Sequence, residues 1–150
     1  NYNCPGQTVV ACAAETVPAL KEAVTAARGK AIQLAVSGAF HSPLMEEAAA
    51  EIAAYLQDKT FQPAKIPVYA NVTAEPYGDP RQLLPLQVKR PVLWQQTIEK
   101  MIGDGFDVFI EVGPGKTLSG LIAKIDSRPK ILHVSDLPSL ENTVAEVNNA

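Results

Sequence analysis

The sequence has 150 residues, of which 47% are hydrophobic and 19% are charged, and its formal net charge is −3. This length fits one modest domain or two small lobes that share a core. A weakly acidic chain without a basic run argues against nucleic acid as a partner. The sequence contains no apolar stretch long enough to span a membrane and no signal region, so no membrane association is expected.

The two cysteines, Cys4 and Cys12, do not make a disulfide framework and lack the spacing of metal ligands. Together with the lack of a signal region, they predict reduced thiols and a cytoplasmic protein. The chain begins with Asn1 instead of methionine, which suggests a segment of a longer protein.

The first half of the chain predicts a small α+β lobe. Its expected elements are a strand at 8–12, a helix at 16–28, a strand at 31–36, a helix at 42–57 and a strand at 66–72. The start of the helix at 42–57 is predicted from Ser42 as the cap and Pro43 in the first turn. This order suggests a split β-α-β pattern.

The second half begins with a proline-rich segment, 76–91, which predicts an irregular crossing between elements. The elements expected after it are a helix at 92–102, a strand at 108–112, a helix at 118–125, a strand at 131–134 and a helix at 137–147. The strand at 108–112 is a continuous apolar run, which is typical of a strand buried on both faces.

His41 lies between a predicted strand and a predicted helix start, where active-site groups tend to collect. A histidine there can act as a general base. The alternative is a histidine that packs in a loop and bonds only to backbone.

A second motif, Gly-Lys-Thr at 115–117, lies between a strand and a helix and resembles the end of a phosphate-binding loop. The complete pattern requires a glycine where the chain has Ile110, and the loop is too short for a triphosphate. We therefore interpret residues 113–115 as a tight turn from a strand to a helix.

Three acidic residues, Glu46, Glu47 and Glu51, fall on the helix that follows His41. Glu47 and Glu51 share one face of that helix. Carboxylates in this arrangement are typical of a solvated surface, so no chemistry is assigned to them.

Four segments together resemble one known family. They are Asn-Tyr-Asn-Cys-Pro-Gly-Gln at 1–7, Gly-Ala-Phe-His-Ser-Pro-Leu-Met at 38–45, a Gln that is followed by Pro-Val-Leu-Trp within 87–94, and Glu-Val-Gly-Pro-Gly-Lys at 111–116. In this order they are similar to motifs of the malonyl-CoA:acyl carrier protein transacylases and the related acyltransferase domains of polyketide and fatty acid synthases. The similarity covers nearly the whole chain.

The resemblance implies transfer of a malonyl group from malonyl-CoA to the phosphopantetheine thiol of acyl carrier protein, as in fatty acid biosynthesis or polyketide synthesis. The family uses a serine in Gly-His-Ser-x-Gly as the nucleophile and a histidine as the base. By resemblance, His41 is that base, and the backbone carbonyl of Gln87 holds its other ring nitrogen. Phe40 matches a position linked to selection of malonyl over branched units, and Asn3 and Gln7 would line the site.

The chain departs from the family pattern because it contains no Gly-x-Ser-x-Gly. The resemblance therefore implies a C-terminal half that needs a missing N-terminal half, so that the chain alone would be inactive. Residues 1–72 would form a ferredoxin-like small subdomain that lacks its first strand. Residues 73–150 would supply the C-terminal elements of a larger α/β-hydrolase-like subdomain. No bound cofactor is expected, since malonyl-CoA is the substrate and the partner carries the phosphopantetheine.

Two other classes of function stay open at this point. The chain could be a non-catalytic module that binds carrier protein, or a pseudo-enzyme fragment. It could also be a cysteine hydrolase that uses Cys4 or Cys12 with His41.

Overall fold

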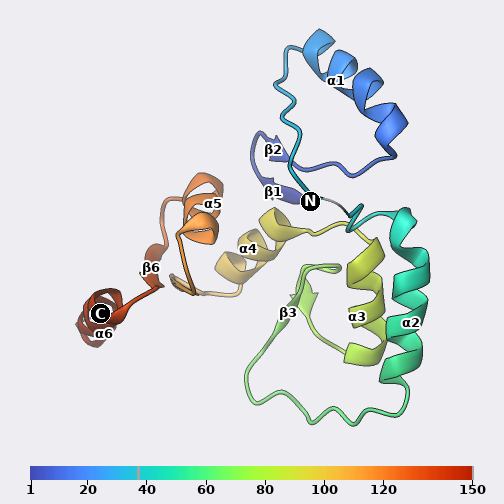
Figure 1. The fold of residues 1–150 in the computed structure, drawn as a ribbon. Helices are drawn as coiled ribbons and strands as arrows, with labels where there is room; N and C mark the ends of the chain where they lie inside the picture. Colours follow the sequence, from blue (N-terminus) through green and yellow to red (C-terminus); the bar gives the residue numbers. More distant parts are fainter. Residues whose placement is uncertain (37, 150) are drawn as a thin grey trace.

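Helices dominate the protein, and the strands pair in twos (Figure 1). The computed structural model describes residues 1–36 and 38–149. In chain order the elements are β1 (Tyr2–Cys4), β2 (Gln7–Thr8), the 3-10 helix η1 (Ala14–Thr16), α1 (Val17–Ala26), the 3-10 helix η2 (Pro43–Met45), α2 (Glu46–Leu56), β3 (Tyr69–Ala70), β4 (Glu75–Pro76), α3 (Pro80–Lys89), α4 (Trp94–Gly103), β5 (Val108–Val112), α5 (Thr117–Ile125), β6 (Lys130–Val134) and α6 (Leu137–Asn148). This mixture of helices and strands confirms the predicted α/β class. Within the described ranges, no helix is long and apolar enough to cross a membrane.

The C-terminal part is a β-α-β unit in which β5 and β6 pair in parallel, in register from Val108↔Lys130 to Val112↔Val134. The buried centre of its core is formed by Ile98, Phe109 and Ile122. The strands and helices predicted for this part are confirmed, to within one or two residues at their ends.

The strand at 108–112, whose apolar run is typical of burial on both faces, exposes one face in this chain, as expected for a half without its partner segment. Phe109 points into the core, whereas Ile110 and Val112 on the opposite face are 44% and 78% exposed. The cause is that, among the described residues, helices cover one face of β5 and nothing covers the other.

α2 and α3 pack side by side (Figure 1), although the sequence predicted an irregular segment where α3 lies. The side chain of Asp79 caps α3 by accepting a hydrogen bond from the backbone N–H of Arg81, and Pro80 follows at the first helical position. Pro85 lies within the helix and is buried. The prediction was wrong because Pro80 favours a helix start here and packing tolerates Pro85.

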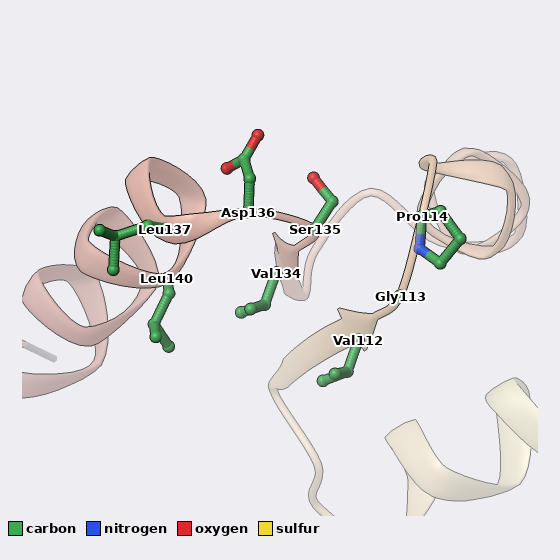
Figure 2. A pocket seen from close by; sticks show the side chains of 8 residues that line it. All are labelled: Val112, Gly113, Pro114, Val134, Ser135, Asp136, Leu137 and Leu140. Atoms are coloured by element: carbon green, nitrogen blue, oxygen red, sulfur yellow. The ribbon is translucent and has the colours of Figure 1, made fainter.

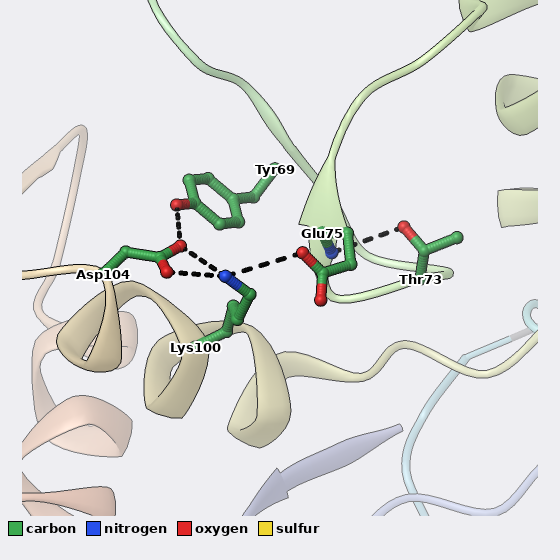
Figure 3. Close-up of polar contacts among 5 residues, drawn as sticks. All are labelled: Tyr69, Thr73, Glu75, Lys100 and Asp104. Atoms are coloured by element: carbon green, nitrogen blue, oxygen red, sulfur yellow. Dashed lines mark hydrogen bonds and ion pairs between the residues drawn. The ribbon is translucent and has the colours of Figure 1, made fainter.

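A polar cluster joins the β3–β4 hairpin to α4 (Figure 3). The Tyr69 hydroxyl donates to the Asp104 carboxylate over 2.6 Å, and Lys100 contacts the same carboxylate over 2.6 Å and Glu75 over 3.6 Å. The hydrogen bond from Lys100 lowers the pKa of Asp104 below its ordinary value, and the bond from Tyr69 adds to this effect. The cluster fixes the hairpin to the helix that leads into the core. Of the strand predicted at 66–72, only Tyr69–Ala70 forms a strand.

Two strands predicted in the N-terminal half are changed in the structure. The one at 8–12 is realised only as β2, which pairs antiparallel with β1. The one at 31–36 is wrong, because no strand forms there and its alternating apolar side chains Ile32, Leu34 and Val36 are 69%, 52% and 69% exposed. A strand needs a hydrogen-bonded neighbour, and the described residues provide none at this segment.

Candidate active site

The backbone of His41 is held in an uncommon conformation by the end of α3. Its φ is 62°, in the left-handed region that costs free energy for a residue other than glycine. Its N–H donates to the carbonyl oxygen of Val88 over 2.9 Å. The last carbonyls of a helix have no partner within the helix, so His41 satisfies one of them.

The His41 ring is hydrogen-bonded to the carbonyl of Gln87, the residue before Val88. Nδ1 lies 2.7 Å from the carbonyl oxygen of Gln87, 46 residues away in the sequence, as the motif pair predicted. A carbonyl oxygen can only accept, so Nδ1 carries the proton in this bond. In a neutral imidazole, Nε2 is then the acceptor, and this arrangement suits a general base.

Ser42 follows His41 and caps the next helical turn. Its hydroxyl donates to the carbonyl of Ala39 over 2.7 Å and accepts from the N–H of Leu44 over 3.3 Å. The side chain is buried, with 7% of its residue surface exposed. The predicted capping role is confirmed, and these bonds tie the hydroxyl oxygen to backbone instead of leaving it free as a nucleophile.

Gln87 contacts two parts of the molecule. Its carbonyl accepts from the His41 ring, and its side-chain amide donates to the hydroxyl of Tyr77 at the end of the β3–β4 hairpin. Burial raises the pKa of Tyr77 above its ordinary value, so the hydroxyl keeps its proton. Tyr77 was not found by sequence reasoning, because nothing in the sequence links it to residue 87.

Phe40, the residue before His41, is 57% exposed. Its ring lies over Gly38, where a Cβ would come within 2.5 Å of the ring. A glycine at 38 therefore leaves room for the Phe40 ring, which a Cβ at this position would meet. An exposed ring next to the candidate base can contact a substrate.

Asn3 and Gln7 lie on or beside the strands of the β1–β2 hairpin, which contacts the chain at Val92, four residues after the Val88 that binds His41. The N–H of Tyr2 donates to the carbonyl of Val92 over 2.9 Å. The Gln7 side-chain oxygen accepts from the Cys4 thiol over 3.6 Å, and Cys4 is buried. The structure thus engages the thiol with Gln7 and the Nδ1 of His41 with Gln87, without a hydrogen bond between Cys4 and His41.

The turn at 113–115 is closed by a carboxylate. Glu111 accepts hydrogen bonds from the N–H of Leu118 over 3.1 Å, and from the N–H and hydroxyl of Ser119 over 2.7 and 2.6 Å. The hydroxyl bond from Ser119 is the main reason why the pKa of Glu111 is lowered. The carboxylate occupies the helix N-terminus where a phosphate would bind, which supports the interpretation of a structural turn.

An open hollow of about 480 Å³ lies at the carboxyl ends of β5 and β6 (Figure 2). Its lining is mainly apolar and consists of Val112, Gly113, Pro114, Val134, Ser135, Asp136, Leu137 and Leu140. Asp136 is engaged in capping α6 through a bond from the N–H of Ser139. The hollow therefore offers mainly apolar contact surface, and its one carboxylate is used in capping α6.

Similar proteins were found among curated sequences and solved structures. The malonyl CoA-acyl carrier protein transacylase of Bacillus subtilis is 39% identical over 156 residues, which cover 99% of this chain and 49% of the relative. That of Staphylococcus aureus is 37% identical and covers 94% of this chain and 47% of its own length. No family model matches the sequence.

The structural matches agree with these relatives. A crystal structure named as MCAT from Streptococcus pneumoniae superposes with a TM-score of 0.92 at 38% identity, over 97% of this chain and 49% of that one. A complex of a type II PKS acyl-carrier protein with its malonyl-transacylase superposes with a TM-score of 0.85 at 31% identity, over 89% of this chain and 44% of that one.

The chain spans about half the length of the curated relatives that it matches. Their names agree with those of the structural matches at high similarity in fold. The chain belongs to the family of malonyl CoA-acyl carrier protein transacylases, and it corresponds to their C-terminal half.

Proposed function

We propose that this chain supplies the base of an active site that transfers malonyl groups from malonyl-CoA to acyl carrier protein, while the other half of the protein supplies the serine. The observation that carries the proposal is the 2.7 Å contact between His41 Nδ1 and the Gln87 carbonyl. It fixes the tautomer in which Nε2 accepts a proton, and it orients the ring as an aspartate does in a catalytic triad.

Nε2 would serve both halves of the reaction. It takes the proton of the serine as the serine oxygen attacks the malonyl thioester, and it returns this proton to the departing sulfur of coenzyme A. In the second half it takes the proton of the phosphopantetheine thiol, which attacks the malonyl-serine ester, and returns it to the serine oxygen. No further cofactor is needed for this chemistry.

The serine belongs to the other half in this proposal. The chain has no Gly-x-Ser-x-Gly, and Ser42, the serine next to the base, is engaged with backbone groups. The relatives are about twice as long as this chain, so there is room for the missing segment.

The exposed apolar surfaces support an interface with that segment. Val112 on β5 and Leu137 on α6, both at the hollow, are 78% and 65% exposed. The alternating segment 31–36 also has an unpaired backbone and exposed apolar side chains. We propose that the missing half covers these surfaces, with residues 1–72 as a ferredoxin-like subdomain completed by its first strand and residues 73–150 as part of the larger subdomain.

The remaining site residues have supporting roles in this proposal. Phe40 would crowd a branched α-carbon and so favour malonyl over methylmalonyl, because its exposed ring adjoins the base. Asn3 and Gln7 would line the site from the β1–β2 hairpin. Acyl carrier protein is the proposed partner, in keeping with the solved complex of a relative with its carrier protein.

The test is malonyl transfer by the complete protein, measured with His41→Ala and with Gln87→Ala as the matched control. Loss of a general base lowers kcat by roughly 10²- to 10⁴-fold. Gln87→Ala keeps the backbone carbonyl that holds the ring, so we expect its kcat to stay within about tenfold of the unsubstituted protein. Transfer by His41→Ala at the normal rate would contradict the proposal.

A further inference from the structure

The position of His41 depends on the last turn of α3. Both of its contacts to that turn are carbonyl acceptors, Gln87 for the ring and Val88 for the backbone. The left-handed φ of 62° means that residue 41 does not take this conformation by its own preference. Any shift of the end of α3 relative to the start of α2 therefore moves the candidate base.

α3 lacks one hydrogen bond in its interior. Pro85 has no N–H, so the helix lacks the hydrogen bond that would join residue 85 to residue 81. Arg90 is already extended, with φ −110° and ψ 156°, because a proline follows it. The N–H of Arg90 still donates to the carbonyl of Leu86 over 2.8 Å, so the last turn is closed, and its position relative to α2 depends on contacts between the two helices.

An ion pair provides such a contact. Lys89, the last residue of α3, places Nζ 2.6 Å from Oε1 of Glu46, the first residue of α2. The Lys89 side chain is only 22% exposed, although that of Glu46 is 68% exposed. Each charge also lies at the helix end that favours it, the anion at an N-terminus and the cation at a C-terminus.

We propose that Glu46 and Lys89 are positioning residues that act on His41 through the two helix ends on either side of it. The inference rests on the proposed function of His41 and goes beyond it, since neither side chain bonds to the ring. The pair joins the start of α2, which follows His41 in the chain, to the end of α3, whose carbonyls bind His41. Loss of the pair would let the Gln87 carbonyl move relative to Nδ1 and leave the ring less well oriented.

Another ion pair in the chain provides a matched control. Lys130 and Glu146 are 2.5 Å apart and join β6 to α6. These elements lie at the far end of the molecule from α2 and α3 in Figure 1. An effect of ion-pair loss on stability alone should appear in Lys130→Met as well as in Lys89→Met.

The experiment measures kcat and KM for malonyl transfer by the complete protein with Glu46→Gln, with Lys89→Met and with the reversed pair Glu46→Lys/Lys89→Glu. We expect each single variant to lower kcat roughly two- to fivefold, the range for loss of one partly exposed pair, with KM unchanged. The reversed pair restores the contact but places each charge at the helix end that disfavours it, so it should recover part of the lost kcat and not all of it. Lys130→Met should leave kcat as it was.

A second readout follows the ring directly. The ¹⁵N resonances of His41 report which nitrogen carries the proton, and both single variants should shift the population away from the Nδ1–H tautomer. Unchanged kcat and unchanged resonances, with His41→Ala inactive, would overturn the inference while the proposed function stands. A change in KM alone for Lys89→Met would also overturn it, because Lys89 would then contact substrate. A fully active His41→Ala would instead remove the proposed function itself.

Discussion

His41 precedes the helical turn that leads into α2, Glu111 lies in the strand that leads into α5, and the protein holds the two residues in opposite ways. Glu111 accepts three hydrogen bonds from residues seven and eight positions further along the chain. His41 is held by carbonyls of α3, and its ring bond spans 46 residues. One site is closed by local contacts and the other by tertiary contacts.

The difference lies in what each site leaves free. The Glu111 carboxylate accepts from the donors at the start of α5, so these N–H groups are not available to a ligand. At His41 the contacts use the backbone N–H and Nδ1 and leave Nε2 without a bond among the described residues. A glycine-rich turn before a helix is therefore structural here, whereas a histidine before a helix retains a reactive atom.

The largest expected effect is on malonyl transfer when the half of the protein that supplies the serine is absent. We expect the 150-residue chain alone to transfer no malonyl, and activity to appear when the missing half is added in trans, because the base then meets its serine. The measurement is transfer from malonyl-CoA to acyl carrier protein. Turnover by the chain alone that Ser42→Ala or Cys4→Ala abolishes would mean that the nucleophile lies within this chain.

The next effect concerns selection at the same site. In the complete protein, Phe40→Ser should relax the preference for malonyl-CoA over methylmalonyl-CoA, since the ring no longer crowds the α-methyl group. One steric contact of this kind changes discrimination by about 1–3 kcal/mol, or roughly 10- to 200-fold in kcat/KM. Unchanged ratios of kcat/KM for the two thioesters would refute this role of Phe40.

The smallest effect concerns the locally closed turn. Glu111→Gln should lower the free energy of unfolding by about 1 kcal/mol, as for loss of a helix cap, without the rate loss expected for His41→Ala. The pKa of Glu111 is lowered by folding, so its contribution is complete above the ordinary value of 4.5 and is lost as the pH falls through the lowered pKa.

The check for Glu111 is the free energy of unfolding as a function of pH for the complete protein and Glu111→Gln. The two curves should be furthest apart above about pH 5 and converge in acid. Glu141→Gln, at an exposed position on α6, is the control and should follow the unsubstituted protein. A constant difference at all pH values would show that the charge of Glu111 does not contribute.

Local sequence patterns were sufficient where the chain supplies its own stabilising contacts. The helices at 92–102, 118–125 and 137–147 have apolar residues at helical spacing, and they formed as predicted. The cap formed by Ser42 could be predicted for the same reason, because its partners lie within three residues. The bond between His41 and Gln87 was predicted from a family motif and not from the residues themselves, since periodicity carries no information about contacts 46 residues apart.

Tertiary structure decided the features that depend on a partner distant in sequence or outside this chain. Residues 31–36 have the alternation of a strand, but no strand among the described residues pairs with them, and their apolar side chains are exposed. α3 formed despite its prolines because it packs against α2 and Asp79 caps it. The tautomer of His41 and the pairing of Lys89 with Glu46 also follow from that packing, since only the position of α3 determines which carbonyl and which carboxylate come within reach.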